Sequence, residues 1–199
     1  MRDSDAEGSP SRSPQQAARK VEEVGGCGCE GVDVPSLLTF RPLVADDASF
    51  LASLQTDPVF AAHAGWRVTN AISDGEGWWR ESIADPDPLL LRLLATTVDG
   101  PVGYVDLHGR EAHVRELGYA IGPSPRWGHG LATEAARAGI EWGFERLHLD
   151  RIWAEAVEAN IASVRVLEKV GMHAVGRGAD ETFLGVPSHY KRYEILRPS

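Results

Sequence analysis

The chain has 199 residues, of which 43% are hydrophobic and 25% are charged, which is typical of a soluble globular protein with one domain or a domain plus a tail. Acidic residues outnumber basic ones by 29 to 20, which argues against a nucleic-acid partner because such binding needs clustered lysine and arginine. No run approaches the roughly 20 apolar residues that cross a bilayer, and the polar N-terminal residues lack the apolar core of a secretory signal. We therefore expect a cytoplasmic protein with no membrane partner.

The first 35 residues differ in composition from the rest of the chain. They contain few large apolar side chains to bury, so we expect residues 1–35 to form a flexible extension and residues 36–199 to form the folded domain. Both cysteines, Cys27 and Cys29, lie in this extension. Their spacing is too short for a usual zinc half-site and no second half-site follows, so we expect neither a bound metal nor a cysteine nucleophile.

The first part of the domain combines strand patterns with two helical patterns. Asp46 and Asp47 precede an apolar helical stripe, and we expect that helix to stop at Asp57-Pro58. Two apolar runs separated by Asp99-Gly100 predict a hairpin. The elements expected here are a strand over 37–41, a helix after Asp46, a helix over 75–84, and strands over 89–98, 102–107 and 115–121.

In the second part, helical and strand periods alternate. The segment 131–144 places apolar residues on one helical face and charged residues on the other. The elements expected here are a loop over 123–130, a helix over 131–144, a strand over 151–157, a helix over 161–170, and two strands within 173–196 around a turn at Gly185-Val186-Pro187. This order predicts a mixed α+β domain built on one central sheet.

The strongest chemical signal is the segment RWGHGLATEA at 126–135, which follows an expected strand and opens a helix. Glycines let the backbone approach a ligand closely, and the N–H groups of such a turn can converge on an anion at a helix N-terminus. A diphosphate is the natural occupant. A tight turn that only permits close helix–sheet packing explains the same spacing equally well. The segment lacks the Gly-Lys-Ser/Thr ending of a P-loop.

A second signal follows one strand later, in the segment NIASVRVLEKVGM at 160–172. Read alone, Asn160 is a typical N-cap residue and Ser163 a surface residue in the first helical turn. Read together and in order, the two segments resemble the GNAT acyltransferase superfamily, and within it the RimJ/RimL-like branch. The segment Leu38–Leu43 with the acidic pair resembles the first strand and helix of that branch, and Glu116-Leu117-Gly118-Tyr119 resembles its fourth strand. The resemblance covers about residues 36–197.

This resemblance implies a single GNAT-like domain with a mostly antiparallel sheet of six to seven strands. The sheet would be splayed between its fourth and fifth strands and flanked by about four helices. The implied co-substrate is acetyl-CoA or another acyl-CoA. Its diphosphate would lie on the backbone of Trp127, Gly128, His129, Gly130, Leu131, Ala132 and Thr133, and its pantetheine arm would pair with Tyr119, Ala120 and Ile121. Asn160 would contact the pantetheine, and Ser163 would donate to the departing thiolate.

The implied reaction is transfer of an acetyl group to a primary amine by direct attack in a ternary complex. A protonated amine cannot attack, so a base must first take its proton. Glu181, slightly favoured, and Glu116 are the candidate bases, and each is also explained as a solvated surface carboxylate. The acceptor would be a small amine or a protein N-terminus, and a homodimer is compatible with the sequence. The alternatives are a catalytically silent acyl-CoA-binding module and a domain that binds ATP or NAD on the glycine turn.

Overall fold

The computed structural model describes residues 37–198. The expected extension, with Cys27 and Cys29, lies outside the described residues. Across 37–198 no helix is both long and apolar enough to cross a bilayer. The elements of this part of the chain are β1 (Thr39–Pro42), α1 (Ala48–Leu54), α2 (Pro58–Ala64), α3 (Ser73–Ala84), β2 (Leu90–Thr97), β3 (Gly100–His108), β4 (Val114–Ile121), α4 (Leu131–Glu145), β5 (Arg151–Val157), α5 (Ile161–Lys169), β6 (His173–Phe183) and β7 (Val186–Leu196).

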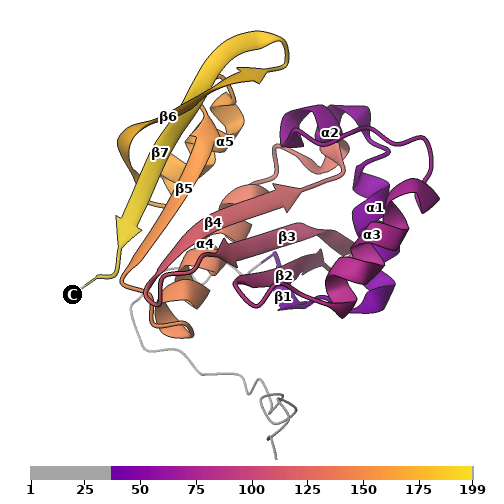
Figure 1. Ribbon diagram of the computed structural model, residues 1–199, viewed down its shortest axis with the longest axis horizontal. Helices are drawn as coiled ribbons and strands as arrows, with labels where there is room; N and C mark the ends of the chain where they lie inside the picture. The colour runs from indigo at the N-terminus through magenta and orange to yellow at the C-terminus, as the bar shows by residue number, and fades with distance from the viewer. Residues whose placement is uncertain (1–36, 199) are drawn as a thin grey trace, which may run out of the picture. The chain divides into compact units, whose positions relative to one another are not determined.

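The strands form one sheet in the order β1-β2-β3-β4-β5-β7-β6. All neighbours are antiparallel except β4 and β5, which run parallel, so the predicted mostly antiparallel sheet is confirmed. The pairing of β4 with β5 extends only from Val114–Arg151 to Glu116–Trp153. Beyond Glu116 the two strands diverge (Figure 1). The predicted splay between the fourth and fifth strands is therefore confirmed.

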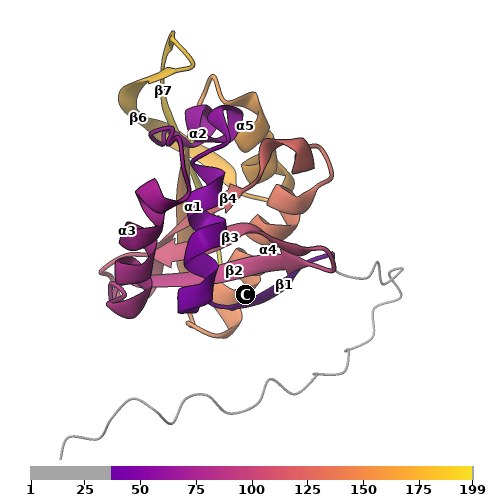
Figure 2. The same ribbon diagram turned by 90° about the vertical axis from the view of Figure 1, so that its right-hand side faces the viewer.

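Helices cover both faces of the sheet, as Figure 2 shows for β2 to β4. On one face, α1 and α3 pack around buried Leu94 and Tyr104. On the other face, α4 and α5 pack against Leu93 and Leu117. Successive side chains of a strand point to opposite faces, so the adjacent Leu93 and Leu94 belong to two separate cores. By the same alternation, the side chain of Tyr119 points to the α4–α5 face of the sheet and that of Glu116 points to the opposite face.

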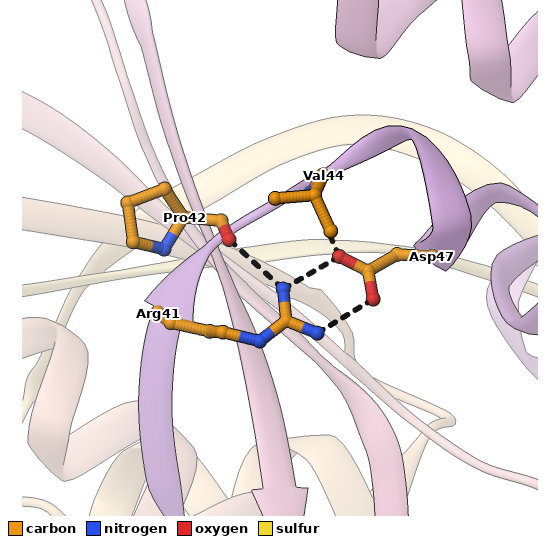
Figure 3. Close-up of polar contacts among 4 residues, drawn as sticks. All are labelled: Arg41, Pro42, Val44 and Asp47. Carbon is orange, nitrogen blue, oxygen red and sulfur yellow. Dashed lines mark hydrogen bonds and ion pairs between the residues drawn. The ribbon is translucent and has the colours of Figure 1, made fainter.

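A buried carboxylate ties β1 to the start of α1. Asp47, which is 6% exposed, accepts two N–H groups of Arg41 at 2.7 Å and the backbone N–H of Val44 at 2.8 Å (Figure 3). Burial opposes ionisation of Asp47, but these donors hold its pKa below the usual value. The acidic pair thus lies in a 3-10 turn, Ala45–Asp47, and not in the first turn of α1, which begins at Ala48.

Asp57-Pro58 was expected only to end a helix. This prediction was wrong, because α2, a helix that the sequence did not predict, begins there. Asp57 caps α2 by accepting the N–H groups of Val59 and Phe60 at 3.0 Å. Pro58 occupies the first helical position, where its missing N–H leaves no bond unmade. The second carboxylate oxygen of Asp57 accepts the N–H of Ser124 at 2.6 Å, which joins α2 to the loop before α4. Asp57 and Pro58 therefore start α2, whereas α1 already ends at Leu54.

The hairpin of β6 and β7 turns one residue earlier than predicted. Leu184 and Gly185 form the turn with φ values of 50° and 81°. Positive φ at both central residues matches a type I′ turn, which suits the twist of a hairpin. Val186 and Pro187 belong to β7, whose pairing with β5 begins only at Tyr190. Pro187 therefore has one unpaired side, which is where a strand tolerates a missing N–H.

Candidate functional site

A cleft of about 440 Å³ opens where β4 and β5 separate, a size suited to a small-molecule ligand. Its walls are the end of β4, the loop entering α4, α5 and α2. His129, Glu116 and Glu181 lie outside the cleft lining. The other residues expected to bind the coenzyme all line it: Tyr119, Ala120, Ile121, Trp127, Gly128, Gly130, Leu131, Ala132, Thr133, Asn160 and Ser163.

The glycine turn presents the N-terminus of α4 to this cleft. Gly128 and Gly130 have φ values of 85° and 82°, a left-handed conformation that favours glycine. Gly130 is the N-cap of α4, and no side chain caps the first turn. The N–H groups of that turn have no partner within the helix, and the helix dipole gives them a partial positive charge. This end of the cleft is therefore suited to an anion.

Trp127 fixes the turn to β4 through its side chain. Its indole Nε1 donates to the carbonyl oxygen of Ile121 at 2.6 Å. The ring also contacts His63 of α2, with 4.9 Å between ring centroids, and His63 in turn contacts Phe183 at the end of β6 at 5.4 Å. Sequence reasoning missed the α2 wall of the cleft because it missed α2, and it gave Trp127 only a backbone role.

The start of α5 holds three polar groups together. The Oδ1 of Asn160 accepts the N–H of Ser163 at 3.2 Å, so Asn160 is the N-cap that the sequence allowed. The Oγ of Ser163 lies 2.9 Å from the hydroxyl of Tyr119, which reaches across from β4. Burial raises the pKa of Tyr119 to about 12, although the Ser163 contact acts in the opposite direction. Tyr119 therefore remains a hydroxyl donor at neutral pH.

Three basic residues that the sequence analysis did not single out also line the cleft. Arg126 contacts Thr97 Oγ1 at 3.2 Å. Arg165 and Lys169 lie four residues apart on α5, a spacing that places them on one helical face. Among the residues the structure describes, neither of these two forms an ion pair. They supply positive charge to the α5 wall of the cleft, and their i,i+4 spacing is the sequence signal that could have found them.

Glu116 lies at the last pair of β4 with β5, where the strands begin to separate. Burial and the nearby carboxylate of Glu155 raise its pKa, against the weaker opposing effects of His108 and Arg192. A half-buried carboxylate with a raised pKa accepts a proton more readily than an ordinary glutamate does. Its strand position directs it to the sheet face opposite Tyr119.

Glu181 is exposed on β6 and does not line the cleft. Its Oε1 accepts the N–H of Thr182 at 2.7 Å, and its Oε2 lies 3.5 Å from the hydroxyl of Tyr190. The pKa of Tyr190 is raised by burial, by Glu181 and, to a smaller extent, by Glu155 and Glu116. These three carboxylates therefore lie around one phenol. Across residues 37–198, no group of three or more histidine, cysteine or acidic side chains is arranged to hold a metal ion.

Comparison with known proteins identifies the family. Residues 38–173 match the family model described as acetyltransferase (GNAT) domain. The chain is 39% identical over 74 residues to the uncharacterized protein YkkB of Bacillus subtilis, a match that covers 37% of this chain and 42% of YkkB. It is 31% identical over 121 residues to the putative ribosomal N-acetyltransferase YdaF of the same organism, which covers 59% of this chain and 64% of YdaF. The matched region thus spans less than two thirds of either relative.

Among solved structures, the fold is similar to that of spermidine N-acetyltransferase from Vibrio cholerae in complex with CoA and spermine. The TM-score is 0.69 at 22% identity, over 81% of this chain and 96% of that one. At this identity the likeness concerns the fold. The family model spans more than half of the chain, and the splayed sheet and cleft agree with it. The chain therefore belongs to the acetyltransferase (GNAT) family.

Proposed function

We propose that this protein is an N-acetyltransferase of the RimJ/RimL-like branch that transfers the acetyl group of acetyl-CoA to a primary amine. The observation that carries the proposal is the cleft that joins the uncapped N-terminus of α4 to the gap between β4 and β5. The diphosphate would lie on the glycine turn. The pantetheine arm would extend along the unpaired edge of β4 past Tyr119, and the thioester would lie at the separation of the strands.

The chemistry then takes place across the gap between the strands. Glu116 would take the proton of the acceptor ammonium, directly or through a water. The free amine attacks the thioester carbonyl, the C–N bond forms, and the C–S bond breaks as its electron pair moves to sulfur. The nitrogen then releases its second proton to water, which leaves the neutral amide. Ser163 would donate to that sulfur. Glu116 is favoured over Glu181 because it is half-buried at the separation of the strands, whereas Glu181 is exposed on β6.

The acceptor would be a small amine or a protein N-terminus. The similar spermidine acetyltransferase and the relative YdaF support these two classes, and the net charge of −9 suits a cationic acceptor. A matrix of acyl-CoA donors and amines, including spermidine and peptides with free N-termini, tests the proposal by detection of released thiol. Acetyl-CoA turnover with at least one amine is the expected result. Tight coenzyme binding with no turnover would instead identify a silent acyl-CoA-binding module.

We expect the R165Q/K169Q double variant to bind coenzyme A about tenfold more weakly than the wild type, because both cations lie on the cleft wall and neither has an ion-pair partner within residues 37–198. Isothermal calorimetry at two salt concentrations measures the loss, which should shrink as salt screens the phosphates. R110Q/R146Q is the matched control, because it removes the same charge at two positions outside the cleft lining.

Dephospho-coenzyme A provides the second arm of this experiment. A smaller loss with dephospho-coenzyme A than with coenzyme A assigns the pair to the 3′-phosphate, and an equal loss assigns it to the diphosphate. Unchanged affinity for both ligands would contradict a phosphate-binding role. ATP and NAD serve as competitors, because stronger thermal stabilisation by either would indicate the nucleotide-binding alternative.

A further inference from the structure

The contact between Tyr119 and Ser163 joins two elements that are 44 residues apart in the chain. The Tyr119 hydroxyl lies 2.9 Å from Ser163 Oγ and 3.3 Å from the backbone oxygen of Ser163. Both side chains line the cleft beside the strand separation. The proposed function gives Ser163 a role at the sulfur but leaves the phenol of Tyr119 without one.

The direction of this hydrogen bond follows from the chemistry of the two hydroxyl groups. A phenol is far more acidic than an aliphatic alcohol, so it is the better donor of the pair. The phenol has a single hydrogen, and of its two possible acceptors Ser163 Oγ at 2.9 Å is nearer than the backbone oxygen of Ser163 at 3.3 Å, which favours donation to Oγ. With Ser163 Oγ accepting from Tyr119, the hydrogen of Ser163 is free to point into the cleft. Burial keeps the phenol protonated, so this donor is present at any ordinary pH.

We propose that Tyr119 is a positioning residue for the leaving group: its hydroxyl donates to Ser163 Oγ and directs the Ser163 hydrogen toward the coenzyme sulfur. This inference rests on the proposed function. As the C–S bond breaks, the electron pair moves to sulfur, and the Ser163 hydroxyl donates a hydrogen bond to the resulting thiolate. The donation from Tyr119 makes the Ser163 hydroxyl a stronger donor, because hydrogen bonds in a chain polarise one another. The thiolate later takes its proton from water.

If the role of Tyr119 were only structural, its hydroxyl would do no more than hold β4 and α5 together. The start of α5 already has a cap, because Asn160 accepts the N–H of Ser163. Removal of a purely structural Tyr119 hydroxyl would lower the stability of the protein or its affinity for the coenzyme, whether or not Ser163 carries its hydroxyl. Loss of a positioning donor would instead change the acidity of the bound thiol, and only when that hydroxyl is present.

The test measures the proton affinity of the thiol of bound coenzyme A by the ultraviolet absorbance of its thiolate during a pH titration. The variants are Y119F, S163A and Y119F/S163A, all in a C27S/C29S background, so that the bound coenzyme carries the one thiol in the sample. Y193F is the matched control, because Tyr193 is fully buried in the same α4–α5 core and its hydroxyl has no partner among the described residues. Calorimetry on the same samples establishes coenzyme binding.

We expect Y119F and S163A each to make the bound thiol hold its proton about tenfold more tightly, the size of one hydrogen bond to a charged group. The double variant should match S163A, and Y193F should match the wild type. A Y119F effect that persists in the S163A background, or that appears only in coenzyme affinity, would overturn the role of Tyr119. Absence of coenzyme binding by the wild type would contradict the proposed function itself, and the inference with it.

Discussion

Replacing Glu116 with glutamine should lower kcat by about 10²- to 10⁴-fold while changing the KM for acetyl-CoA little. The reason is that the amine loses its base while the coenzyme cleft, which Glu116 does not line, stays intact. Glu181→Gln is the matched control, since it makes the same change on the exposed strand β6. Steady-state kinetics with the best amine of the matrix measures both variants. A large fall with Glu181→Gln and a small one with Glu116→Gln would reverse the assignment.

The pH profile gives an independent check on Glu116. A base works only when deprotonated, and burial together with Glu155 raises the pKa of Glu116. The acidic limb of kcat should therefore lie at higher pH than an ordinary glutamate would give. Glu155→Gln removes a negative charge that raises the pKa of Glu116. It also releases Arg192 from its ion pair with Glu155, so that Arg192 can lower this pKa further, and the acidic limb of kcat should move to lower pH. A limb that does not move would show that another group controls the profile.

Gly103→Ala should cost at least about 3 kcal/mol of folding free energy, a size reserved for severe clashes and backbone strain. Gly103 lies on β3 with φ 150°, and an added Cβ would be only 1.9 Å from the carbonyl oxygen of Ala120 and 2.9 Å from Cα of Ile121. Both clashes are with backbone, so no side chain can move aside. The displaced segment of β4 lines the coenzyme cleft, so affinity for coenzyme A should fall as well.

Differential scanning calorimetry and urea titration measure this loss. For a chain of this length, about 3 kcal/mol corresponds to a fall in Tm of roughly 6–12 °C. Gly77→Ala is the matched control, because the added Cβ meets nothing within 4 Å beyond its own stretch of helix and alanine favours the interior of α3. It should leave Tm unchanged or slightly raised. Equal Tm values for the two variants would mean that β4 moves away from β3 at little cost.

Much of the fold was predictable because its signals are local. Hydrophobic periodicity located every strand and four of the five helices found across residues 37–198. Asp57-Pro58 shows the limit of that approach. The pair starts α2 and does not end α1, which stops at Leu54, and the third hydrogen bond of Asp57 reaches Ser124, which is 67 residues away. Leu184 shows the same limit, because no local propensity favours a leucine at positive φ in the turn.

The site was only partly predictable for a similar reason. The glycine turn and Asn160 are contiguous motifs, so the sequence could place them at the ends of helices. The contact of Tyr119 with Ser163 and that of Trp127 with Ile121 depend on how strands and helices meet in space. Which of Glu116 and Glu181 is better suited to act as the base depends on burial, and the sequence around two separate glutamates does not reveal burial.

The early end of the β4–β5 pairing has a consequence for how this protein avoids unwanted partners. An unpaired strand edge normally lies at the rim of a sheet, where it can recruit another chain and aggregate. Here the edge of β4 beyond Glu116 is internal, with β3 on one side and β5, β7 and β6 on the other. To pair with this edge, a strand of another protein would have to insert between β4 and β5, inside the sheet. The fold thus keeps backbone groups available to a slender ligand while shielding them from association with other proteins.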